Sequence, residues 1–593
     1  MKIGIDFDRV LFDTDRFKED LNTEFPRFGD TYDQAKQDGF YNLEKHAEIM
    51  EVDQKELLDE MRNCSEYLYS DVGKLEELRK EHEVIVVTRG DPVIQKEKLQ
   101  YSGVLEYVDG YEIITEGTKE VADIDFLVDD WKEELERVNI PGIQVDPDDK
   151  NIEKILEHLT PPDFEKVFKR YDIRGSYPEE LNESFAYRLG ESLGRLITER
   201  GEEKAVLTKD PKETSGNLKE CLKKGLTSQG IHVIDCGTGP TDYTAFSAVE
   251  EESTGVQVSS SHMPLNFNGF KLVYPEGNGF MNEDLDRLKQ IFRKNRFEEQ
   301  ETGSLTRKSY GKEYLSRMES FFGEYFDEVD RKVVVENMGG RQSSRLAEIL
   351  EELGAEVENL SSEKPDINPP DPKPENLSHV EEKVEKSDAD LGIATDMDAD
   401  RVAVYFDGEW LTGDEVFAVL IEVVKPEKVV ASIDSTEIVR RTAEKYGKIE
   451  YTRVGDPFVI DRTLETDAEF SGEPNGHYCF TKFVPYNSGT LSGLMLAGAD
   501  LEKIIDELPE IEVKKKSVKV EDKNLVMEKL KKKVEENFRV LSKIDGIKYE
   551  SESSRVLIRS SGSSHKLRIT AEAENSEEAE KAVQEAENLI RNT

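Results

Sequence analysis

Short apolar runs alternate with helical patterns along almost the whole chain, and this alternation limits the fold more than any other feature. KIGIDF opens the chain, EVIVVT follows at residues 83–88 and DIDFLVDD at residues 123–130, with helical stretches between them. Apolar strands separated by helices predict parallel sheets covered by helices. With domains of about 100–200 residues, a chain of this length holds about four or five of them.

Breaks in this pattern mark the domain boundaries. The prolines of TPPDF at residues 160–164 prevent the preceding helix from continuing. We therefore predict an α/β fold in five parts, the last of them a smaller α+β domain. The predicted ranges are residues 1–160, 164–300, 304–405, 406–509 and 512–593.

The charge of the chain limits its partners and its compartment. Its 128 Asp and Glu against 80 Lys and Arg give a formal net charge of -48, which repels nucleic acid and anionic membranes, so we expect neither as a partner. The same charge suits a cytoplasm rich in salt and predicts a halophilic host. The sequence has no apolar run of about 18 residues, and its four cysteines lack metal-ligand spacing. We expect a cytoplasmic monomer or homodimer.

Two carboxylates two residues apart, Asp6 and Asp8, follow the opening strand. At the carboxyl end of a strand both side chains can point the same way, hold Mg²⁺, and leave one as a nucleophile and the other as a general acid/base. The alternative is a plain acidic turn. Features near two later strands favour the catalytic interpretation: Thr88, Lys119, and the pair Asp129 and Asp130.

This order of residues resembles the haloacid dehalogenase superfamily of phosphatases over about residues 1–158, and the helical segment after Asp15 stands where such enzymes insert a cap. The resemblance implies an N-terminal Rossmann-like domain with a small helical cap. The resemblance implies that Asp6 is the phosphorylated nucleophile and Asp8 the acid/base. It also implies a Mg²⁺ site on Asp6 and Asp8 that Asp129 or Asp130 completes. The implied phosphate-binding residues are Thr88 and Lys119, with Lys96 and Lys98 as alternatives to Lys119.

Three loops farther along the chain carry hydroxyls, carboxylates and a guanidinium. VQVSSSHMPLNFNGFKL (Val256–Leu272) is a strand followed by a Ser-rich turn, which alone is typical of a structural loop. TDMDADRVAV places Asp396, Asp398 and Asp400 so that they can face one cation. IRSSGSSHKLRI puts hydroxyls and turn amides beside Arg559, which can form an anion cradle. Together the loops predict a phosphoryl-transfer site built from several domains.

These loops resemble, in the same order, those of the α-D-phosphohexomutases, the phosphoglucomutase/phosphomannomutase family, over about residues 164–593. SSSHMP is similar to the family's T-A-S-H-N-P and implies that Ser261 is the phosphoserine. DMDADR is similar to the metal loop D-G-D-G-D-R, GEPNGH (Gly472–His477) to the sugar loop G-E-x-S-G-H, and RSSGS to the phosphate loop R-x-S-G-T. The sequence departs from the family at Met263 (Asn), Asn475 (often Ser), and Ser564 with His565 (Glu-Pro).

The resemblance also implies the chemistry of the site. Phosphorylated Ser261 would donate to a hexose phosphate, and the resulting hexose 1,6-bisphosphate, intermediate and activator, would turn over and return its other phosphate. Lys271 of NGFK and His477 would transfer protons, and Arg174 of YDIRG would stabilise charge. Mg²⁺ would lie on Asp396, Asp398, Asp400 and the Ser261 phosphate. The implied substrate-binding residues are Arg401, Arg453, Glu473, Asn475, His477, Arg559, Ser561, Gly562 and Ser563.

We therefore predict a bifunctional enzyme, a Mg²⁺-dependent phosphomannomutase/phosphoglucomutase fused to a phosphatase of unassigned substrate. Glu473 and Asn475 offer hydrogen bonds to either epimer at the sugar 2-hydroxyl but no second carboxylate for an amine. Glucose and mannose phosphates are therefore the expected substrates. The alternatives are an N-terminal domain that only binds a ligand or partner, a phosphoglucosamine mutase, and a sugar-phosphate sensor.

Overall fold

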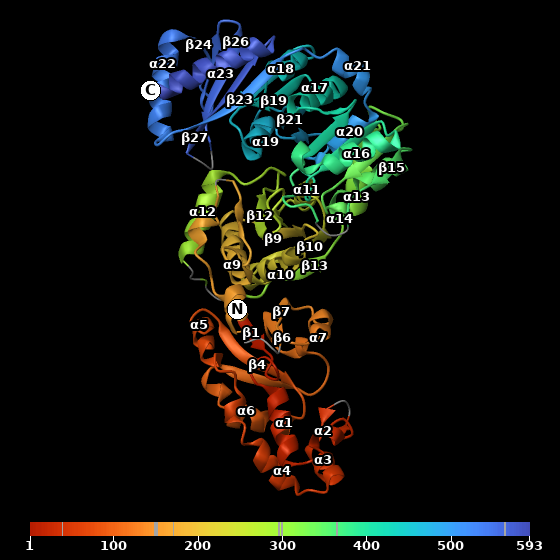
Figure 1. The fold of residues 1–593 in the computed structure, drawn as a ribbon, viewed down its shortest axis with the longest axis vertical. Helices are drawn as coiled ribbons and strands as arrows, with labels where there is room; N and C mark the ends of the chain where they lie inside the picture. The colour runs from red at the N-terminus through yellow and green to blue at the C-terminus, as the bar shows by residue number, and fades with distance from the viewer. Residues whose placement is uncertain are drawn as a thin grey trace.

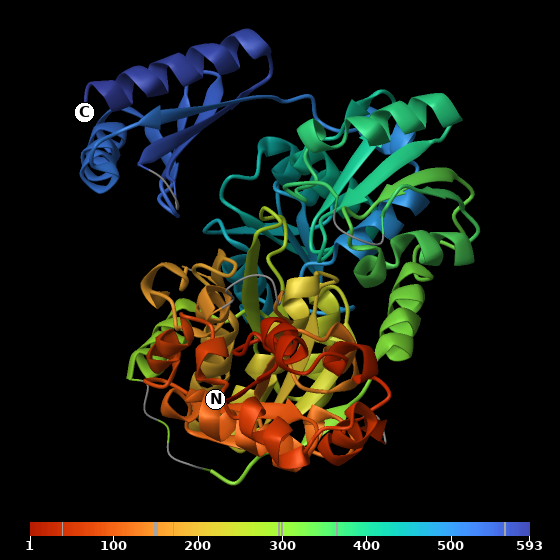
Figure 2. The same cartoon turned by 60° about the horizontal axis from the view of Figure 1, so that its bottom comes forward.

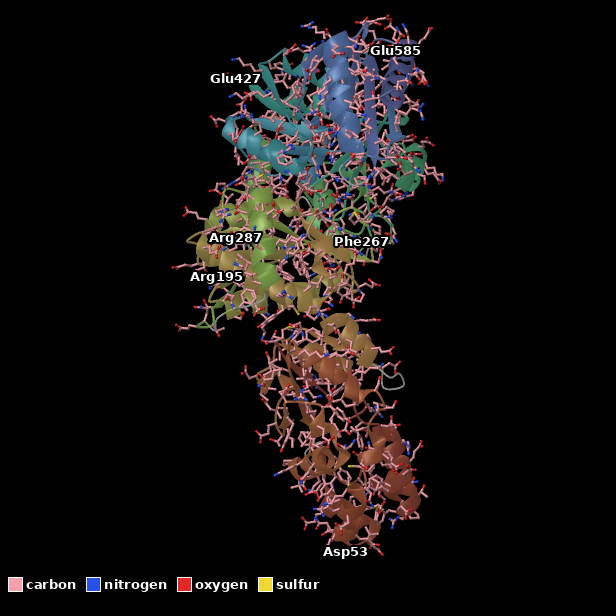
Figure 3. The ribbon with its side chains drawn as sticks, turned by 90° about the vertical axis from the view of Figure 1, so that its left-hand side faces the viewer. Asp53, Arg195, Phe267, Arg287, Glu427 and Glu585 are labelled. Atoms are coloured by element: carbon pink, nitrogen blue, oxygen red, sulfur yellow. The ribbon has the colours of Figure 1, made fainter. Side chains whose placement is uncertain are left out.

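The alternating strands and helices form five sheets of four to six strands and one two-stranded hairpin in the described part of the chain. The sheets follow one another along an elongated molecule (Figure 1). Asp53 of the N-terminal domain and Glu585 of the last helix lie near its opposite ends (Figure 3). None of the helices so described is long and apolar enough to cross a bilayer. The computed structural model describes residues 1–37, 40–146, 152–169, 171–294, 297, 300–362, 366–561 and 565–593.

The N-terminal domain is a parallel sheet in the order β5-β4-β1-β6-β7. The apolar run of β4 is buried, as expected for a central parallel strand. Between β1 and β4 the chain forms a cap of helices α1–α4 around the hairpin β2-β3, at the end of the molecule farthest from the C-terminal domain (Figure 1). The elements are β1 (Lys2–Ile5), α1 (Thr14–Glu24), α2 (Phe28–Thr31), β2 (Lys36–Gln37), β3 (Phe40–Tyr41), α3 (Leu43–Met50), α4 (Gln54–Met61), α5 (Leu75–Leu78), β4 (Glu83–Arg89), α6 (Pro92–Ser102), β5 (Gly110–Ile114), β6 (Phe126–Asp129), α7 (Lys132–Arg137), β7 (Gly142–Gln144) and α8 (Ile152–Leu159).

The second domain has a six-stranded mixed sheet in the order β13-β10-β9-β11-β12-β8, in which β12 is antiparallel to both of its neighbours. Residues 305–307 pair with β10, so the sheet of this domain extends past the predicted boundary at 300–304. The elements are β8 (Ile173–Ser176), α9 (Glu183–Glu199), β9 (Lys204–Lys209), α10 (Glu213–Ser228), β10 (His232–Thr238), α11 (Thr241–Glu251), β11 (Thr254–Val258), β12 (Phe267–Val273), α12 (Asn282–Lys294) and β13 (Leu305–Arg307).

Helices α9 and α10 of this domain pack closely because glycines face each other across the contact. A Cβ added to Gly190 would lie 2.2 Å from the carbonyl oxygen of Leu222, and one added to Gly225 would lie 2.0 Å from that of Tyr187. Any side chain at either position would therefore force the helices apart.

The third domain has the sheet order β15-β14-β16-β17-β18, and the fourth has β20-β19-β21-β22. Residues 409–410 pair with β17, so the third sheet extends past the predicted boundary at residue 405. The elements are α13 (Gly311–Phe322), β14 (Lys332–Glu336), α14 (Arg341–Ser344), α15 (Leu346–Glu352), β15 (Glu356–Asn359), α16 (Ser378–Ser387), β16 (Leu391–Thr395), β17 (Val402–Phe406) and β18 (Glu409–Trp410), then α17 (Gly413–Val424), β19 (Lys428–Ser432), α18 (Glu437–Ala443), β20 (Lys448–Thr452), α19 (Asp456–Glu465), β21 (Phe470–Glu473), β22 (His477–Phe480), α20 (Gly489–Gly498) and α21 (Leu501–Asp506).

The C-terminal domain is an antiparallel sheet, β23-β27-β26-β25-β24, packed against two helices. It has a hydrophobic core of its own, whereas one continuous core joins the third and fourth domains. Figure 2 shows it standing to one side of the other domains. It can therefore move as a unit. Its elements are β23 (Glu512–Lys519), α22 (Lys523–Asn537), β24 (Arg539–Ser542), β25 (Ile547–Ser551), β26 (Ser554–Ser560), β27 (Lys566–Ala573) and α23 (Ser576–Arg591).

A half-buried histidine lies at the junction of the first two domains. His82 Nε2 is 2.8 Å from the Leu159 carbonyl oxygen and 3.2 Å from Ser184 Oγ, so this nitrogen carries the hydrogen that is donated to Leu159. Its Nδ1 is buried without a hydrogen-bond partner among the described residues. Burial lowers the pKa of His82 to about 4, because a second proton would place a charge where nothing solvates it.

The junction should therefore weaken in mild acid. A folded-state pKa below the unfolded value means that the stability is fully present above about pH 6.5 and is lost as the pH falls towards 4, by about 2 kcal/mol at pH 5. His82→Gln keeps a donor for Leu159 but does not titrate. We expect the variant to lose less thermal stability than the parent between pH 7 and pH 5, and equal losses in the two proteins would contradict this expectation.

Candidate functional site

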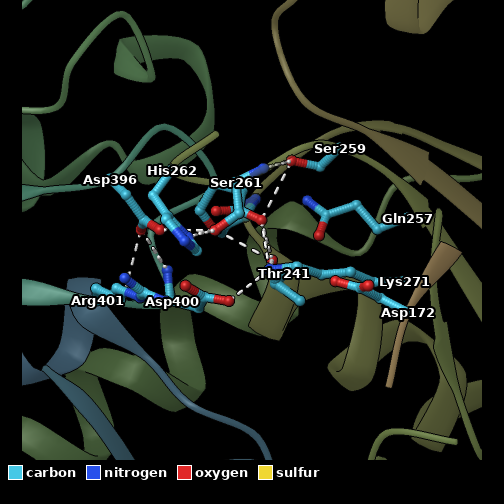
Figure 4. A network of polar contacts seen from close by, with 12 residues as sticks. Asp172, Thr241, Gln257, Ser259, Ser261, His262, Lys271, Asp396, Asp400 and Arg401 are labelled. Carbon is cyan, nitrogen blue, oxygen red and sulfur yellow. Dashed lines mark hydrogen bonds and ion pairs between the residues drawn. The ribbon is translucent and has the colours of Figure 1, made fainter. Parts of the chain in front are cut away.

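The serine loop leaves β11 at Val258 and brings a hydroxyl to the domain interface. Ser261 is 2% exposed and has a positive φ of 52°, a conformation that most residues avoid. Its N–H donates to Ser259 Oγ at 2.9 Å, which holds this turn. The local strain aims the Ser261 hydroxyl across the interface, where its Oγ donates to Asp396 Oδ2 of the third domain at 2.9 Å (Figure 4).

The metal loop between β16 and β17 gathers three buried carboxylates. Asp396 Oδ1 accepts the N–H groups of Asp400 and Arg401 at 3.1 Å each, which closes the loop. Asp396, Asp398 and Asp400 each offer an oxygen within 4.8 Å of the others. The structure thus brings the predicted nucleophile and the predicted metal residues together across 135 residues of sequence.

These carboxylates suit Mg²⁺, which prefers oxygen ligands. Asp398 Oδ1 is buried and has no hydrogen-bond partner in the described chain, so a ligand atom points into the cluster with its bonding capacity unused. Burial, together with repulsion from Asp400 and Asp398, raises the pKa of Asp396 well above its ordinary value. A bound cation would remove that penalty, so the residues fit the ion that the sequence predicts.

Two cationic groups border Asp400. Lys271 Nζ lies 2.6 Å from Asp398 Oδ2 and 2.5 Å from Asp400 Oδ2, and His477 Nε2 lies 3.3 Å from Asp400 Oδ1. Burial disfavours the charge on His477, but Asp400 outweighs it and raises the pKa to about 9. Burial likewise opposes the charge on Lys271, and the two carboxylates raise its pKa well above the usual value. The predicted proton-transfer residues therefore form one connected group.

The sugar loop, between β21 and β22, lies beside this group. Glu473 Oε1 accepts the N–H of Gly455 at 2.8 Å, and Asn475 is exposed, with its Oδ1 accepting the N–H of His477 at 3.3 Å. Asp456 is a second carboxylate at this position. Burial raises the pKa of Asp456 to about 6. The negative charges of Glu473 and Asp400 also raise it, while the positive charge of His477 lowers it. The expectation that the loop offers no second carboxylate is wrong, because the start of α19 folds back onto it.

The phosphate loop reaches this region from the C-terminal domain. Arg559 Nη1 lies 3.5 Å from Asp434 Oδ2 of the fourth domain, and Nη2 lies 3.2 Å from Asp545 Oδ2. Its Nε is buried without a hydrogen-bond partner among the described residues, so the guanidinium keeps a free donor for an anion. Ser561 is buried, while the predicted Gly562 and Ser563 lie outside the described residues.

Of the remaining predicted arginines, Arg401 contacts the site directly, with its Nε 3.2 Å from His477 Nε2. Arg174 pairs with Asp172 at 2.6 Å, Arg401 lies 3.5 Å from Asp371, and the exposed Arg453 lies over the Phe458 ring at 4.6 Å. Both Arg401 and Arg174 act on His262, the neighbour of Ser261. Burial lowers the pKa of His262 strongly, and the positive charges of these two arginines lower it further. Arg174 and Arg401 therefore contribute positive charge beside the serine loop, whereas the described contact of Arg453 is with Phe458.

Two residues at the serine loop were not predicted as site residues. Thr241, at the start of α11, donates from Oγ1 to Asp398 Oδ2 at 3.0 Å. Lys212 donates from Nζ to Ser260 Oγ at 2.6 Å and to the Phe267 carbonyl at 2.7 Å, which ties the two ends of the loop together. The only sequence signal for Lys212 is TKDPKETSG, where lysines stand at the arginine positions of the family.

A second acidic cluster lies at the strand ends of the N-terminal domain. Asp6, Asp129 and Asp130 each offer an oxygen within 4.8 Å of the others. Lys119 Nζ lies 2.8 Å from Asp6 Oδ1 and 2.7 Å from Asp129 Oδ2. Burial raises the pKa of Asp6 to about 8 against the pull of Lys119. The oxygen donor set fits Mg²⁺, and Lys119 rather than a residue of α6 reaches the predicted nucleophile.

Asp8 is held apart from this cluster, although the sequence predicts it as one of the metal ligands. Its Oδ1 accepts from Thr14 Oγ1 at 2.6 Å and pairs with Lys98, and its Oδ2 accepts from Gln95 Nε2 at 2.9 Å. Burial opposes ionisation of Asp8, but Lys98 outweighs it and lowers the pKa to about 2. The Asp8 side chain is therefore not among the metal-binding oxygens, because α6 supplies partners for both of its oxygens.

Both groups open into a cleft of about 750 Å³ between the sheet and the cap. Thr88 lines it with a buried Oγ1 that has no hydrogen-bond partner among the described residues, as expected of a group that awaits a phosphate. The cap side is largely aromatic and cationic. Its lining residues include Lys18, Phe28, Tyr32, Lys36, Phe40 and Tyr41.

A strained, buried serine against a carboxylate cluster, in a chain of successive α/β domains with a separate C-terminal domain, defines a phosphoryl-transfer enzyme of the phosphohexomutase class. Four segments match the domains of one family, phosphoglucomutase/phosphomannomutase, and the chain belongs to it. The matched segments are residues 165–299 (alpha/beta/alpha domain I), 312–409 (domain II), 412–510 (domain III) and 516–589 (C-terminal domain).

Curated relatives and a solved structure agree with this family. A probable phosphoglucosamine mutase of Methanosarcina acetivorans is 33% identical over 71% of this chain and 99% of its own length. A phosphoglucomutase/phosphomannomutase of Thermococcus kodakarensis is 30% identical over 70% of this chain and 96% of its own. A family member of Burkholderia thailandensis shares the fold, with a TM-score of 0.65 at 24% identity over 72% of this chain and 97% of its own.

Proposed function

We propose that the second to fifth domains interconvert the 1-phosphates and 6-phosphates of hexoses through a phosphoserine at Ser261. The observation that carries this proposal is the 2.9 Å contact between Ser261 Oγ and Asp396 Oδ2, which holds the hydroxyl of one domain on the cation-binding loop of another. Phosphoryl transfer depends on positioning and charge stabilisation more than on covalent chemistry, and this contact supports both.

The reaction has two mirrored halves. First, the bond between Ser261 Oγ and phosphorus breaks while phosphorus bonds to the free hydroxyl oxygen of the hexose phosphate. The connected group of Lys271, Asp400 and His477 donates a proton to the departing Ser261 Oγ and takes up the proton of the sugar hydroxyl in its place. The hexose 1,6-bisphosphate then turns over, and Ser261 Oγ bonds to its other phosphorus while the bond from that phosphorus to the sugar oxygen breaks. The proton of Ser261 passes to the same connected group, which protonates the released sugar oxygen. Added bisphosphate would activate the enzyme because it phosphorylates Ser261.

The other groups bind and hold the substrate. Asp396, Asp398 and Asp400 would hold Mg²⁺, which neutralises charge on the transferred phosphoryl group when bound. Arg559, with its free Nε, would bind the phosphate that is not reacting. Because Arg559 belongs to a domain with its own core, closure of that domain would exclude water from the site. Phosphorus NMR on the purified chain tests the proposal, since no exchange among hexose 1- and 6-phosphates would contradict it.

The preferred sugar follows from the sugar loop. Glu473 and Asn475 can accept from and donate to a 2-hydroxyl in either configuration, so we expect kcat/KM for glucose and mannose 1-phosphates to agree within about 100-fold. A phosphoglucosamine mutase is the second candidate, and Asp456 favours it because a second carboxylate beside Glu473 can bind an ammonium group. Several curated relatives also bear that name.

One variant separates the two candidates. If the substrate is an amino sugar, Asp456→Asn should lower kcat/KM for glucosamine 1-phosphate about 10–100-fold, the loss expected for a charged hydrogen bond. If glucose and mannose are the substrates, the same variant should leave their kcat/KM within about threefold of the parent. Glucosamine 1-phosphate as the best substrate of the parent would overturn the hexose proposal.

The N-terminal domain, we further propose, is a phosphatase. Asp6 Oδ would bond to the phosphorus of a phosphate monoester while the ester oxygen leaves and takes a proton from the Asp8 and Lys98 pair. Water would then attack the aspartyl phosphate, lose its proton to that pair, and release phosphate with Asp6 restored. Asp6, Asp129 and Asp130 would hold Mg²⁺ and Lys119 the phosphoryl oxygens. The unpartnered Thr88 hydroxyl in the same cleft supports catalysis over a purely binding role.

A further inference from the structure

Lys18 stands out among the cations of the N-terminal cleft. It lies on α1, lines the cleft and is half-buried, with its Nζ 4.1 Å from the centre of the Tyr32 ring. Within the described chain, no carboxylate lies within 4.0 Å of this ammonium group. By contrast, Lys98 and Lys119 are bound by aspartates, and Lys36 pairs with Asp33 at 2.7 Å.

The absence of a carboxylate partner for Lys18 among the described residues is unexpected in so acidic a chain. The chain carries 128 acidic residues against 80 basic ones, so a carboxylate partner would have been easy to supply. Burial lowers the pKa of Lys18, which means that its charge is held in the cleft at a cost. An anionic ligand would relieve that cost, and the Tyr32 ring restricts where the ammonium can go.

The position of Lys18 separates it from the reacting phosphate. Thr14, which bonds Asp8, begins α1, and Lys18 follows one turn later, about 6 Å farther along the helix. The phosphate would lie at the strand ends, on Lys119 and Thr88, whereas Lys18 belongs to the cap. A cleft of about 750 Å³ has room for a small ester that spans both.

We propose that the N-terminal site takes phosphate monoesters whose leaving part carries a second anionic group, a carboxylate or another phosphate, and that Lys18 binds this group. The inference rests on the proposed phosphatase function of Asp6. It makes Lys18 a residue that determines specificity. A carboxylate and a phosphate would bind Lys18 by the same charge attraction, and the choice of substrate in the test distinguishes them.

The test compares substrates that differ in the second charge. The pairs are 2-phosphoglycolate with ethyl phosphate and glucose 1,6-bisphosphate with glucose 6-phosphate, assayed for phosphate release in the full chain with Ser261→Ala, which stops consumption by the other site. We expect the doubly charged member of at least one pair to have the higher kcat/KM by about tenfold or more. Lys18→Gln should lower that ratio by about tenfold or more, to a value close to one.

Two control variants define the cause. Lys18→Arg keeps the charge and should restore most of the ratio, and Lys55→Gln removes an exposed lysine of the cap that does not line the cleft and should leave the ratio unchanged. The pair that responds shows whether a carboxylate or a phosphate is bound. If p-nitrophenyl phosphate is hydrolysed in an Asp6-dependent way but neither pair shows a preference, the inference fails and the phosphatase stands. If no ester is hydrolysed, both proposals fail.

Discussion

Replacement of Ser261 by alanine should abolish isomerisation while the chain stays folded. The Ser261 hydroxyl is the one protein group that the proposed isomerisation phosphorylates, and loss of a covalent nucleophile costs about 10⁴-fold or more. The substitution removes one oxygen and the contact to Asp396. Isomer exchange by phosphorus NMR gives the rate, and peptide mass analysis of the parent should find the phosphate on Ser261.

Ser260→Ala is the matched control. This neighbouring hydroxyl is also buried but accepts from Lys212 and does not face Asp396, so its loss should cost no more than about tenfold, the effect of one hydrogen bond to a charged group. The phosphate should remain on Ser261 in that variant. Robust turnover by Ser261→Ala, with no other residue phosphorylated, would refute the phosphoserine mechanism.

The sequence carries most of the information about which residues meet at strand ends. The resemblance to the haloacid dehalogenases implied that Asp6 and Asp129 lie together, and sheet geometry explains why they do: the carboxyl ends of parallel strands share one edge of a sheet, and β1 and β6 are adjacent and parallel. Local pattern also predicts an apolar strand such as β4. The strand prediction depends only on short-range periodicity.

Contacts between domains could not be predicted from the local sequence pattern. The chemistry of the loops predicted one site built from several domains, but the specific contact of Ser261 with Asp396 followed from the family resemblance, because nothing in either loop specifies a partner 135 residues away. Thr241 and Asp456 carry no motif, and their roles arise from how helix starts pack against neighbouring loops. Asp8 likewise resembles a metal ligand in sequence, yet Lys98 on a separate helix binds it.

The domain boundaries show the same limit at smaller scale. Short edge strands such as β13 and β18 follow a break in pattern, yet each pairs with a strand that precedes the break. Pairing of a strand of two or three residues depends on the exposed edge already present and not on its own composition. A boundary drawn from composition therefore falls a few residues early.

The two activities should separate at Asp6. Asp6→Asn removes the proposed nucleophile but keeps the size of the side chain, and Lys119 retains Asp129 as a partner. Phosphate release should fall at least about 10³-fold. Isomerisation should stay within about twofold, because the cleft lies beneath the cap, at the far end of the molecule from the C-terminal domain (Figure 1). Malachite green detection of phosphate and phosphorus NMR measure the two rates on one sample.

Asp15→Asn is the control, since Asp15 is an exposed carboxylate on the same segment that pairs with Arg9 and does not line the cleft. It should keep both activities. If Asp6→Asn lowers isomerisation and phosphate release together in a folded protein, the two reactions share one site and the division at residues 160–164 has no functional meaning. If the parent releases no phosphate from any ester, the N-terminal domain binds a ligand without turning it over, and its buried acidic cluster serves recognition instead of catalysis.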